Sequence, residues 1–224
     1  MKYNFNAIVL ASVLSVVTNV NAGTILSPTA ALASNEFSSS FSINNTIDQS
    51  GLSSGFVSGV TDFDTFLALN PTHSTNASFE WFTSAGVTSA QVDYNLGSVY
   101  TIDRLALWNE EASGIGAFDI LTSSDNITFS LLLAGLMPFN NPLTSDYSAE
   151  VFSFSSTLAQ YIRFNITGCP QVDSIFNGCA IGEVAFSVNQ GEVSTVPVPA
   201  ALPLMASALG IFGLARRRNK SKAV

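Results

Sequence analysis

The sequence predicts an all-β sandwich, and three observations support this prediction. Apolar residues in the central part of the chain alternate with polar ones at a period of two, the spacing of a half-buried strand. Gly, Asn, Asp, Ser and Pro separate the alternating segments. No span between the two ends shows the 3.6-residue period of an amphipathic helix. Short strands joined by turns are typical of a sandwich or jelly roll.

Residues 161–167 and 180–188 give the clearest strands. Their inward faces consist of alternate apolar residues, which are Ile162, Phe164 and Ile166 in the first and Val184, Phe186 and Val188 in the second. Further strands are expected at residues 77–82, 91–96, 102–108, 118–123, 129–133 and 150–154. Outside these strands, Phe63 and Phe66 are expected to lie in the core.

The first 22 residues have the features of a secretory signal peptide. Lys2 supplies a positive charge, residues 7–17 form an apolar stretch, and Val-Asn-Ala at 20–22 suits signal peptidase. The sequence therefore predicts export, with cleavage after Ala22. The alternative is a first core helix, which is disfavoured because the Ser-rich sequence from Gly23 onward does not continue a helical period.

The last part of the chain predicts a membrane-spanning helix with a cytoplasmic basic end. Residues 200–215 carry no charge, and three arginines and two lysines follow within residues 216–222. This run is shorter than the ~20 residues that usually span a membrane, so a buried core helix is the alternative. The abrupt basic end favours an anchor in the inner membrane. The polar residues 189–195 are expected to link the domain to this anchor.

The anchor region consists of Val196-Pro197-Val198-Pro199, then the apolar run of small residues, then the arginine cluster. In this order of parts, residues 195–222 resemble the PEP-CTERM sorting tail of Gram-negative bacteria. Val198 stands where the motif that names the family has Glu. The resemblance implies that an exosortase recognises and removes the tail. The protein would then be anchored only transiently and passed to the cell surface, outer envelope or extracellular matrix.

The part between the two targeting segments is strongly acidic. Residues 23–199 contain two basic residues, Arg104 and Arg163, against all sixteen Asp and Glu, which gives a formal charge of −14. Nucleic acids and anionic lipids are therefore excluded as partners, because both need a basic surface. The balance suits calcium, neutral glycans or solubility outside the cell.

Four blocks of the central region, residues 92–105, 118–129, 161–164 and 181–186, follow one another in a distinctive order. The first contains Asp93, Leu96 and Gly97 and then Ile102-Asp103-Arg104, and the second runs into Ser-x-Asp-x-x-x-Phe. In these blocks the chain resembles discoidin-like domains, the C-type domains of coagulation factors. The resemblance implies an eight-stranded jelly roll, also called galactose-binding-like, over residues 23–188.

Two cysteines, Cys169 and Cys179, are the only ones in the chain. An even pair in an exported protein predicts a disulfide, which would close a short loop and stabilise the fold by ~3 kcal/mol. A thiol metal site is disfavoured, since His73 is the only histidine and the chain has no other thiol.

A calcium site is the first candidate for function. Residues 48–55, together with Asp62 and Asp64, form a Gly- and Ser-rich acidic region, and Ca²⁺ prefers carboxylate and carbonyl oxygens from such loops. The discoidin resemblance implies that an early loop and the Glu of the closing strand share a structural calcium. It therefore assigns Asp48 and Glu183 as ligands. The alternative is that these acids are solvated turn formers and caps.

A glycan surface on the loops is the second candidate. Sugars are bound by an aromatic face together with amide or carboxylate groups. Trp108 is the best candidate, because it ends a strand and polar residues follow at once. The full set is Trp81, Phe82, Trp108, Asn109, Glu110, Phe139 and Asn140, with Asn141 beside it. The alternative is that Trp81 and Trp108 are core residues of the sandwich.

The function predicted from these features is non-catalytic binding of exopolysaccharide or another glycan by an exported protein. A structural component of the matrix or cell surface, without a small ligand, is the alternative. A glycosidase ranks third, because Glu110 and Glu111 would point to opposite faces if they lay on a strand.

Overall fold

Two strands of nineteen residues, β5 (Ala90–Trp108) and β9 (Glu150–Gly168), run antiparallel through the domain. The computed structural model describes residues 23–189. The predicted signal peptide, the linker from residue 190 and the sorting tail lie outside these residues, and Asn189 is the last residue of β11 (Glu183–Asn189). Among residues 23–189, no helix has the length and apolar character needed to cross a membrane.

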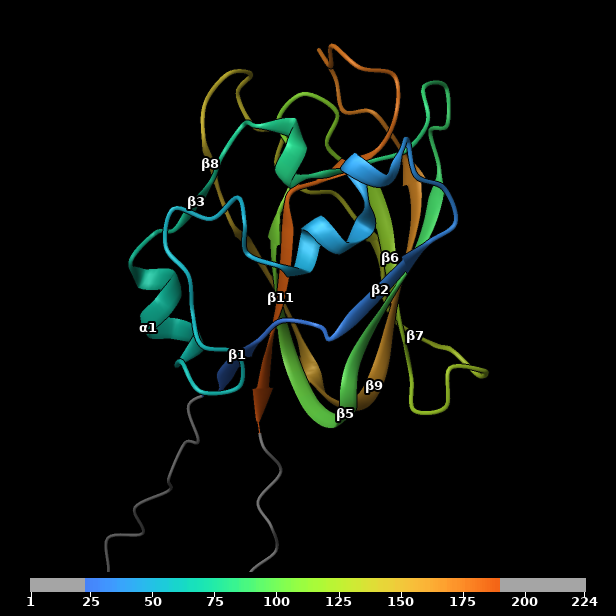
Figure 1. The fold of residues 1–224 in the computed structure, drawn as a ribbon. Helices are drawn as coiled ribbons and strands as arrows, with labels where there is room; N and C mark the ends of the chain where they lie inside the picture. The colour runs from blue at the N-terminus through green and yellow to red at the C-terminus, as the bar shows by residue number, and fades with distance from the viewer. Residues whose placement is uncertain (1–22, 190–224) are drawn as a thin grey trace, which may run out of the picture.

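Both long strands bend in the middle, so that each contributes to two layers (Figure 1). The register between them shifts between Asn95 and Tyr100, where Gly97 has a φ of 86°. Glycine adopts this conformation without the steric penalty of a Cβ. The first half of β5 pairs with the last half of β9, and the second half of β5 with the first half of β9. The bend therefore turns one continuous pairing into two facing layers.

Further strands extend each layer. The layer that contains the second half of β5 continues through β11 to β1 (Thr24–Leu26). The other layer adds β2 (Ala30–Ala33) beside β5, and β6 (Ala117–Ser123) and then β7 (Ser130–Leu136) beside β9. Two small sheets pair β4 (Trp81–Phe82) with β10 (Ala180–Ile181), and β3 (Thr72–His73) with β8 (Tyr147–Ser148).

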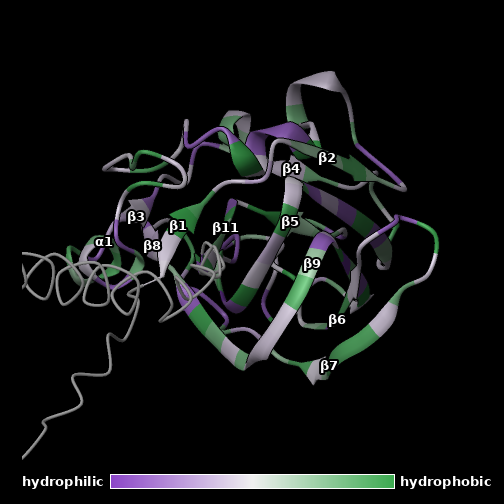
Figure 2. Cartoon of the chain, turned by 90° about the horizontal axis from the view of Figure 1, so that it is seen from below, coloured by the Kyte–Doolittle hydropathy of each residue, from purple (hydrophilic) through white to green (hydrophobic). Residues whose placement is uncertain are grey.

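The main core lies between the two layers and follows the predicted alternation. The inward residues predicted for the two clearest strands are all buried, and Figure 2 shows hydrophobic and hydrophilic bands alternating along the sheet. Phe164 contacts Tyr94 and Phe118, with ring centroids 5.2 and 5.0 Å apart. The buried Tyr94 hydroxyl lies 3.2 Å from Thr46 Oγ1, so its polar end is also satisfied.

A second core covers the outer face of β11 and β5. Helix α1 (Phe63–Ala68) begins at Asp62, whose side chain accepts a hydrogen bond from Thr65 N, as expected of a helix N-cap. Phe63 and Phe66 are buried here, as predicted, against Trp108 and neighbouring residues. The sequence showed no helical period inside the domain, and α1 is too short, at six residues, to produce one.

The strand boundaries differ from the prediction in several places, and the predicted strand 180–188 is divided into β10 and β11. The segments 91–96 and 102–108 belong to the single strand β5, and 150–154 and 161–167 to β9. The segment 77–82 is mostly not a strand, because Asn76 caps a 3-10 turn, η3 (Ala77–Phe79). Two further 3-10 turns, η1 (Ser39–Phe41) and η2 (Ile43–Ile47), and the short strands bring the described residues to eleven strands rather than eight.

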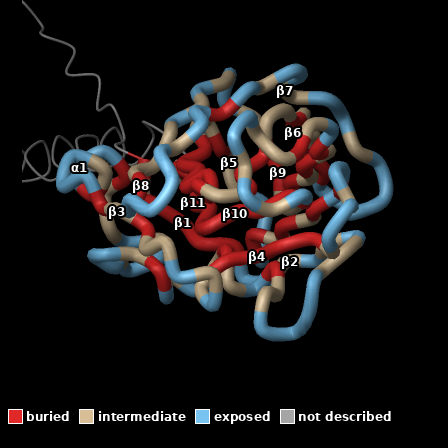
Figure 3. The backbone as a smooth tube through the Cα atoms, turned by 90° about the horizontal axis from the view of Figure 1, so that it is seen from above, coloured by how far each residue is buried: buried red, intermediate tan, exposed pale blue. Residues whose placement is uncertain are grey.

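The bends bring four connecting segments together at the opposite end of the sandwich, called the loop end below (Figure 1). These segments precede and follow β5 and β9. Backbone hydrogen bonds join them: Ile175 N donates to Ala112 O over 3.1 Å, and Gly86 N donates to Asn177 O over 2.6 Å. In Figure 3, which looks onto this end, the buried strands β4 and β10 lie at the centre, among exposed loops.

The predicted disulfide between Cys169 and Cys179 is present, with the two Cα atoms 5.1 Å apart. It joins the end of β9 to the residue before β10, at the base of the loop 170–178. Cys179 N also donates to Thr83 Oγ1 over 2.8 Å, which ties this loop to the segment after β4. The disulfide therefore holds one wall of the loop end in place.

We predict that replacing both cysteines, as Cys169→Ala with Cys179→Ala, lowers the free energy of unfolding by about 2–4 kcal/mol, because the unfolded chain gains the freedom of the open loop. Urea unfolding of the two proteins measures this difference. An unchanged midpoint and slope would show that the disulfide does not constrain the domain.

Candidate functional site

A pocket of about 440 Å³ opens at the loop end. Its lining comes from η1 and the residues before it, from β4 and the segment before it, from the residues that follow β5, and from the loop 170–178. The lining residues are Phe37, Phe41, Thr75, Ala77, Phe82, Glu110, Glu111, Ala112, Ile175 and Phe176. This volume is within the range of small-ligand sites. We call it the aromatic pocket.

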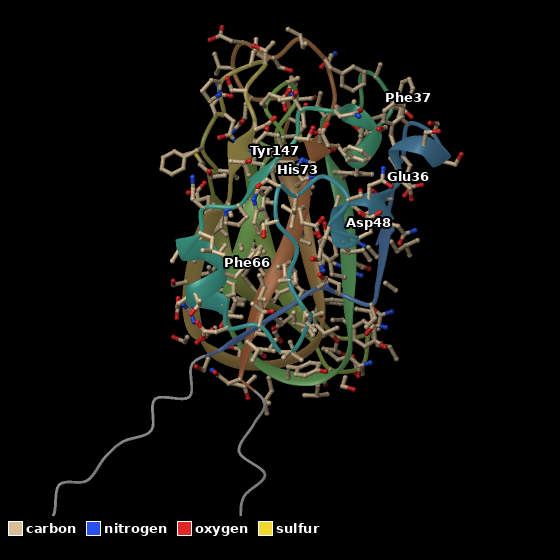
Figure 4. The ribbon with its side chains drawn as sticks, turned by 60° about the vertical axis from the view of Figure 1, so that its left-hand side comes forward. Glu36, Phe37, Asp48, Phe66, His73 and Tyr147 are labelled. Carbon is tan, nitrogen blue, oxygen red and sulfur yellow. A yellow bond between two sulfur atoms is a disulfide. The ribbon has the colours of Figure 1, made fainter. Side chains whose placement is uncertain are left out.

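Four phenylalanines form the wall of the aromatic pocket. Phe37 and Phe176 have ring centroids 6.0 Å apart, and each also contacts one of the other two rings edge to face. Phe41 and Phe82 complete the set at 5.7 Å. Phe37 is 50% exposed, so this wall presents apolar surface to solvent at the loop end (Figure 4). Exposed rings gathered in a pocket are typical of a ligand site.

The turn that carries Phe37 is held by hydrogen bonds. Phe37 N donates to Phe82 O over 2.7 Å, which fixes this segment beside β4. Glu36 Oε1 accepts from Ile43 N at 2.8 Å and from Ser42 Oγ at 3.1 Å, which closes the turn between them. These hydrogen bonds position Phe37 beside β4 before any ligand binds.

Glu110 and Glu111 line the pocket, and the buried Glu80 lies next to them; we call these three carboxylates the floor of the pocket. Glu110 and Glu111 come shortly after the end of β5, and Glu80 comes just before β4. One carboxylate oxygen from each of these three residues lies within 4.8 Å of the others. Ser113 N donates to Glu110 Oε2, and Tyr147 Oη donates to Glu80 Oε1 over 2.8 Å. Glu110 and Glu111 would point to opposite faces only on a strand, and this condition is not met, because β5 ends at Trp108.

Burial dominates the electrostatics of the floor. Burial, together with the charge of the neighbouring Glu110, raises the pKa of Glu80 to about 9. Burial and the adjacent Glu111 raise the pKa of Glu110 to about 8. Burial lowers the pKa of His73 to about 4, so this imidazole is neutral where its Nδ1 lies 2.9 Å from Tyr147 Oη (Figure 4). No charged histidine therefore balances the three carboxyl groups.

Two of the predicted ligand residues are core residues instead. Trp81 and Trp108 have no exposed surface, so neither can stack on a sugar, and their assignment to the glycan surface was wrong. Trp108 Nε1 donates to Pro71 O over 2.9 Å and Trp81 Nε1 to Asn35 O over 3.1 Å. Trp108 is buried because the second core covers the outer face of β5. Without this cover, the side chain would be exposed on the outer face of the sandwich.

The other predicted ligand residues are divided between places. Phe82 and Glu110 lie in the aromatic pocket. Asn109 is buried, and its amide bonds the backbone of Ile115 and Phe139, so it shapes the turn instead of facing a ligand. Phe139 is 72% exposed in a separate hollow, and Asn140 Nδ2 donates to Val172 O over 2.8 Å.

The predicted calcium ligands Asp48 and Glu183 are connected by a hydrogen bond from the residue that follows Asp48. Gln49 N donates to Glu183 Oε2 over 3.0 Å, while Glu183 Oε1 is buried without a hydrogen-bond partner among the described residues. Burial raises the pKa of Glu183 well above its usual range, and Asp48 adds to this. Asp62 and Asp64 belong elsewhere, because the first caps α1 and the second pairs with Arg104.

Comparison with known proteins gives a fold. No protein-family model matches the chain, and no curated protein sequence matches it. The chain is similar to a chitosan-binding module of a chitosanase/glucanase from a Paenibacillus species, at a TM-score of 0.51 and 18% identity, over 74% of this chain and 98% of the module. The fold is the discoidin-like β-sandwich. This result confirms the predicted all-β sandwich, while the predicted flanking helices lie outside the described residues.

Two further similar structures come from Clostridium perfringens. One is a family 32 carbohydrate-binding module solved with galactose, at a TM-score of 0.48 and 17% identity over 73% of this chain and 97% of the module. The other is a module of a family 31 glycoside hydrolase, at a TM-score of 0.49 and 16% identity over 74% of this chain and 92% of the module.

We predict that Trp108→Ala lowers the free energy of unfolding by about 3–5 kcal/mol, because it opens a cavity in the second core and removes the bond to Pro71 O. Chemical denaturation measures the loss. Phe37→Ala serves as the comparison, since its ring is half exposed and its removal should change stability far less. Equal stability of Trp108→Ala and the native protein would contradict the core assignment.

The raised pKa values predict a pH dependence of stability in metal-free protein. Glu80 and Glu110 keep protons in the folded state up to about pH 9 and 8, whereas their pKa is 4.5 without perturbation. The folded state therefore binds more protons, and stability falls as the pH rises. We expect the free energy of unfolding to fall between pH 6.5 and 9, which is above the range where His73 contributes. The fall is up to ~1.4 kcal/mol per pH unit for each carboxyl group that is protonated only in the folded state.

Thermal unfolding in EDTA across this pH range measures the effect. The Glu80→Gln variant should show a shallower fall than the native protein, because it has lost one of the titrating groups. A flat profile in the native protein would mean that the carboxyl groups are ionised throughout.

Proposed function

We propose that this is an exported, non-catalytic protein that binds exopolysaccharide or another glycan in the aromatic pocket. The observation that supports this best is the combination of four phenylalanine rings with Glu110 and Glu111 in one pocket at the loop end. Pyranose rings present C–H groups on their faces and hydroxyls at their edges. Phenylalanine rings pack against the faces, and carboxyl groups bond the hydroxyls.

The similar module from Paenibacillus is described as chitosan-binding, so this fold is used for sugar binding in at least one protein. The proposal for this chain depends on its own pocket, since fold alone does not determine function. The domain has no lysine, and its two arginines pair with Asp64 and Asp93. A ligand that carries many negative charges would therefore be repelled, and neutral or amine-bearing glycans fit better.

The arrangement of the acids supports binding without catalysis. Glycosidases place two carboxyl groups on either side of the scissile bond. Here the oxygens of Glu80, Glu110 and Glu111 gather on one side, within 4.8 Å of one another, with Glu80 fully buried. The other residues that line the pocket carry no carboxylate. A sugar in the pocket would therefore meet the carboxylates of this one group only.

The proposed location is the cell surface, outer envelope or extracellular matrix of a Gram-negative bacterium. Its support comes from the predicted signal peptide and from the sorting tail around Val196, Pro197 and Pro199, which imply signal peptidase and an exosortase as partners. The disulfide Cys169–Cys179 is consistent with an oxidising compartment. The apolar run would hold the protein in the inner membrane before processing.

A structural calcium between Asp48 and Glu183 is part of the proposal. These residues fit the ion for two reasons. Glu183 Oε1 is a buried oxygen without a hydrogen-bond partner in the described part of the chain. Asp48 directly precedes Gln49, whose backbone N–H donates to the other oxygen of Glu183. Such an ion would fasten the loop at residues 48–55 to β11, with carboxylate oxygens as its ligands.

A structural matrix component is the second candidate, and one surface favours it. The edge strand β7 exposes large apolar side chains, including Leu131 at 62%, and β9 exposes Leu158 at 67%. An unpaired edge strand with apolar residues can pair with another copy. This candidate would take the lead if no glycan binds.

The test is binding of the purified full-length protein to a panel of neutral, amino and acidic glycans. We expect Phe37→Ala and Phe176→Ala each to weaken binding about tenfold or more, because each removes a ring from the wall, and tenfold corresponds to ~1.4 kcal/mol. Phe139→Ala is the matched control, since it removes an exposed ring outside the pocket. Loss of binding only in Phe139→Ala would move the site to the other hollow.

A further inference from the structure

The three carboxylates at the floor of the aromatic pocket, Glu80, Glu110 and Glu111, are buried together. Glu80 has no exposed surface, and Glu110 and Glu111 are 1% and 8% exposed. Separate segments of the chain supply them, one just before β4 and the other just after β5. Their approach to within 4.8 Å is therefore a product of the fold and not of sequence spacing alone.

Side chains of the described domain do not compensate this charge. Residues 23–189 contain two arginines and no lysine. Arg104 pairs with Asp64 and Asp103, and Arg163 with Asp93. A buried carboxylate is costly unless it is protonated or meets a positive charge.

Hydrogen bonds hold one oxygen of two of these carboxylates and leave other oxygens free. Glu80 Oε1 accepts from Tyr147 Oη, and Glu110 Oε2 from Ser113 N, so both groups are fixed in orientation. Glu80 Oε2 and Glu111 Oε2 are buried and have no hydrogen-bond partner in residues 23–189. Buried oxygens of this kind are rare in native proteins and call for a partner, such as an ion.

We propose that Glu80, Glu110 and Glu111 bind a divalent cation at the floor of the aromatic pocket, and that this cation is Ca²⁺. The ligand set consists of hard oxygens, which Ca²⁺ and Mg²⁺ prefer. Ca²⁺ binds oxygens at about 2.3–2.6 Å, so oxygens that lie within 4.8 Å of one another can share one ion. Three carboxylates favour Ca²⁺, because Mg²⁺ usually keeps several waters and binds through one or two carboxylates.

The position of this site gives it a second consequence, which rests on the proposed glycan function. Glu110 and Glu111 line the pocket, so the open positions of the ion face the space in which a sugar would lie. Ca²⁺ takes six to eight oxygen ligands, and three carboxylates supply only part of them. Sugar hydroxyls would complete the coordination, and glycan binding would then require calcium.

The test of cation binding is isothermal titration calorimetry of the EDTA-treated full-length protein with CaCl₂, without glycan. The background variant is Glu183→Gln, because it removes the other calcium site proposed above. In this background we expect one Ca²⁺ per chain, and at least tenfold weaker binding after adding Glu111→Gln or Glu80→Gln. Glu150→Gln is the matched control, since Glu150 bonds Phe139 N outside the cluster. MgCl₂ should bind at least tenfold more weakly.

Several results would overturn the proposal. One is the absence of Ca²⁺ binding in the Glu183→Gln background, which would mean that the cluster is simply protonated. Another is binding that Glu111→Gln and Glu80→Gln leave unchanged. Circular dichroism in EDTA checks that each variant is folded. If Glu183→Gln does not fold, Glu111→Gln alone must lower the Ca²⁺ stoichiometry of the native chain by one.

Glycan binding with and without EDTA separates this inference from the proposed function. Glycan binding that persists in EDTA supports the proposed function and contradicts a bridging role of calcium. Calcium binding without any glycan binding supports the cation site and contradicts the proposed function.

Discussion

The antiparallel pairing of β5 with β9 is the interaction on which the rest of the structure depends. Because both strands bend near Gly97, their four ends lie at the same end of the sandwich. The segments that carry Phe82, Glu110 and Phe176 are attached to these ends, although they are far apart in the sequence. A sheet holds such ends rigidly, which is why loops on a rigid scaffold are a common place for binding sites.

The floor of the pocket buries carboxyl groups whose ionised form is costly in the protein interior. A domain with two arginines has few ways to neutralise acids in its interior, yet Glu80, Glu110 and Glu183 are all buried. Such groups lower stability unless a proton or a cation accompanies them. A cation bound at the floor of the pocket or at Glu183 would therefore stabilise the fold by compensating these buried charges.

Much of the fold could be predicted from the sequence, because alternation depends on neighbouring residues. Ile162, Phe164 and Ile166 alternate and are buried, and the paired cysteines form the disulfide. The failures have long-range causes. Trp108 ends a strand beside polar residues, but α1 from another part of the chain covers its face. Nothing local to Trp108 indicates this cover.

The site was harder to predict than the fold for the same reason. Phe37 and Phe41 stand out as apolar residues in a Ser-rich segment, which was the only local signal for the wall. Their contact with Phe82 and Phe176 depends on tertiary packing.

The most direct test of glycan binding in the aromatic pocket is an ¹H–¹⁵N NMR titration with a glycan. We expect chemical-shift changes at Glu110, Glu111 and Phe176 and none at the bend around Gly97. Changes confined to residues outside the aromatic pocket would contradict glycan binding at this site.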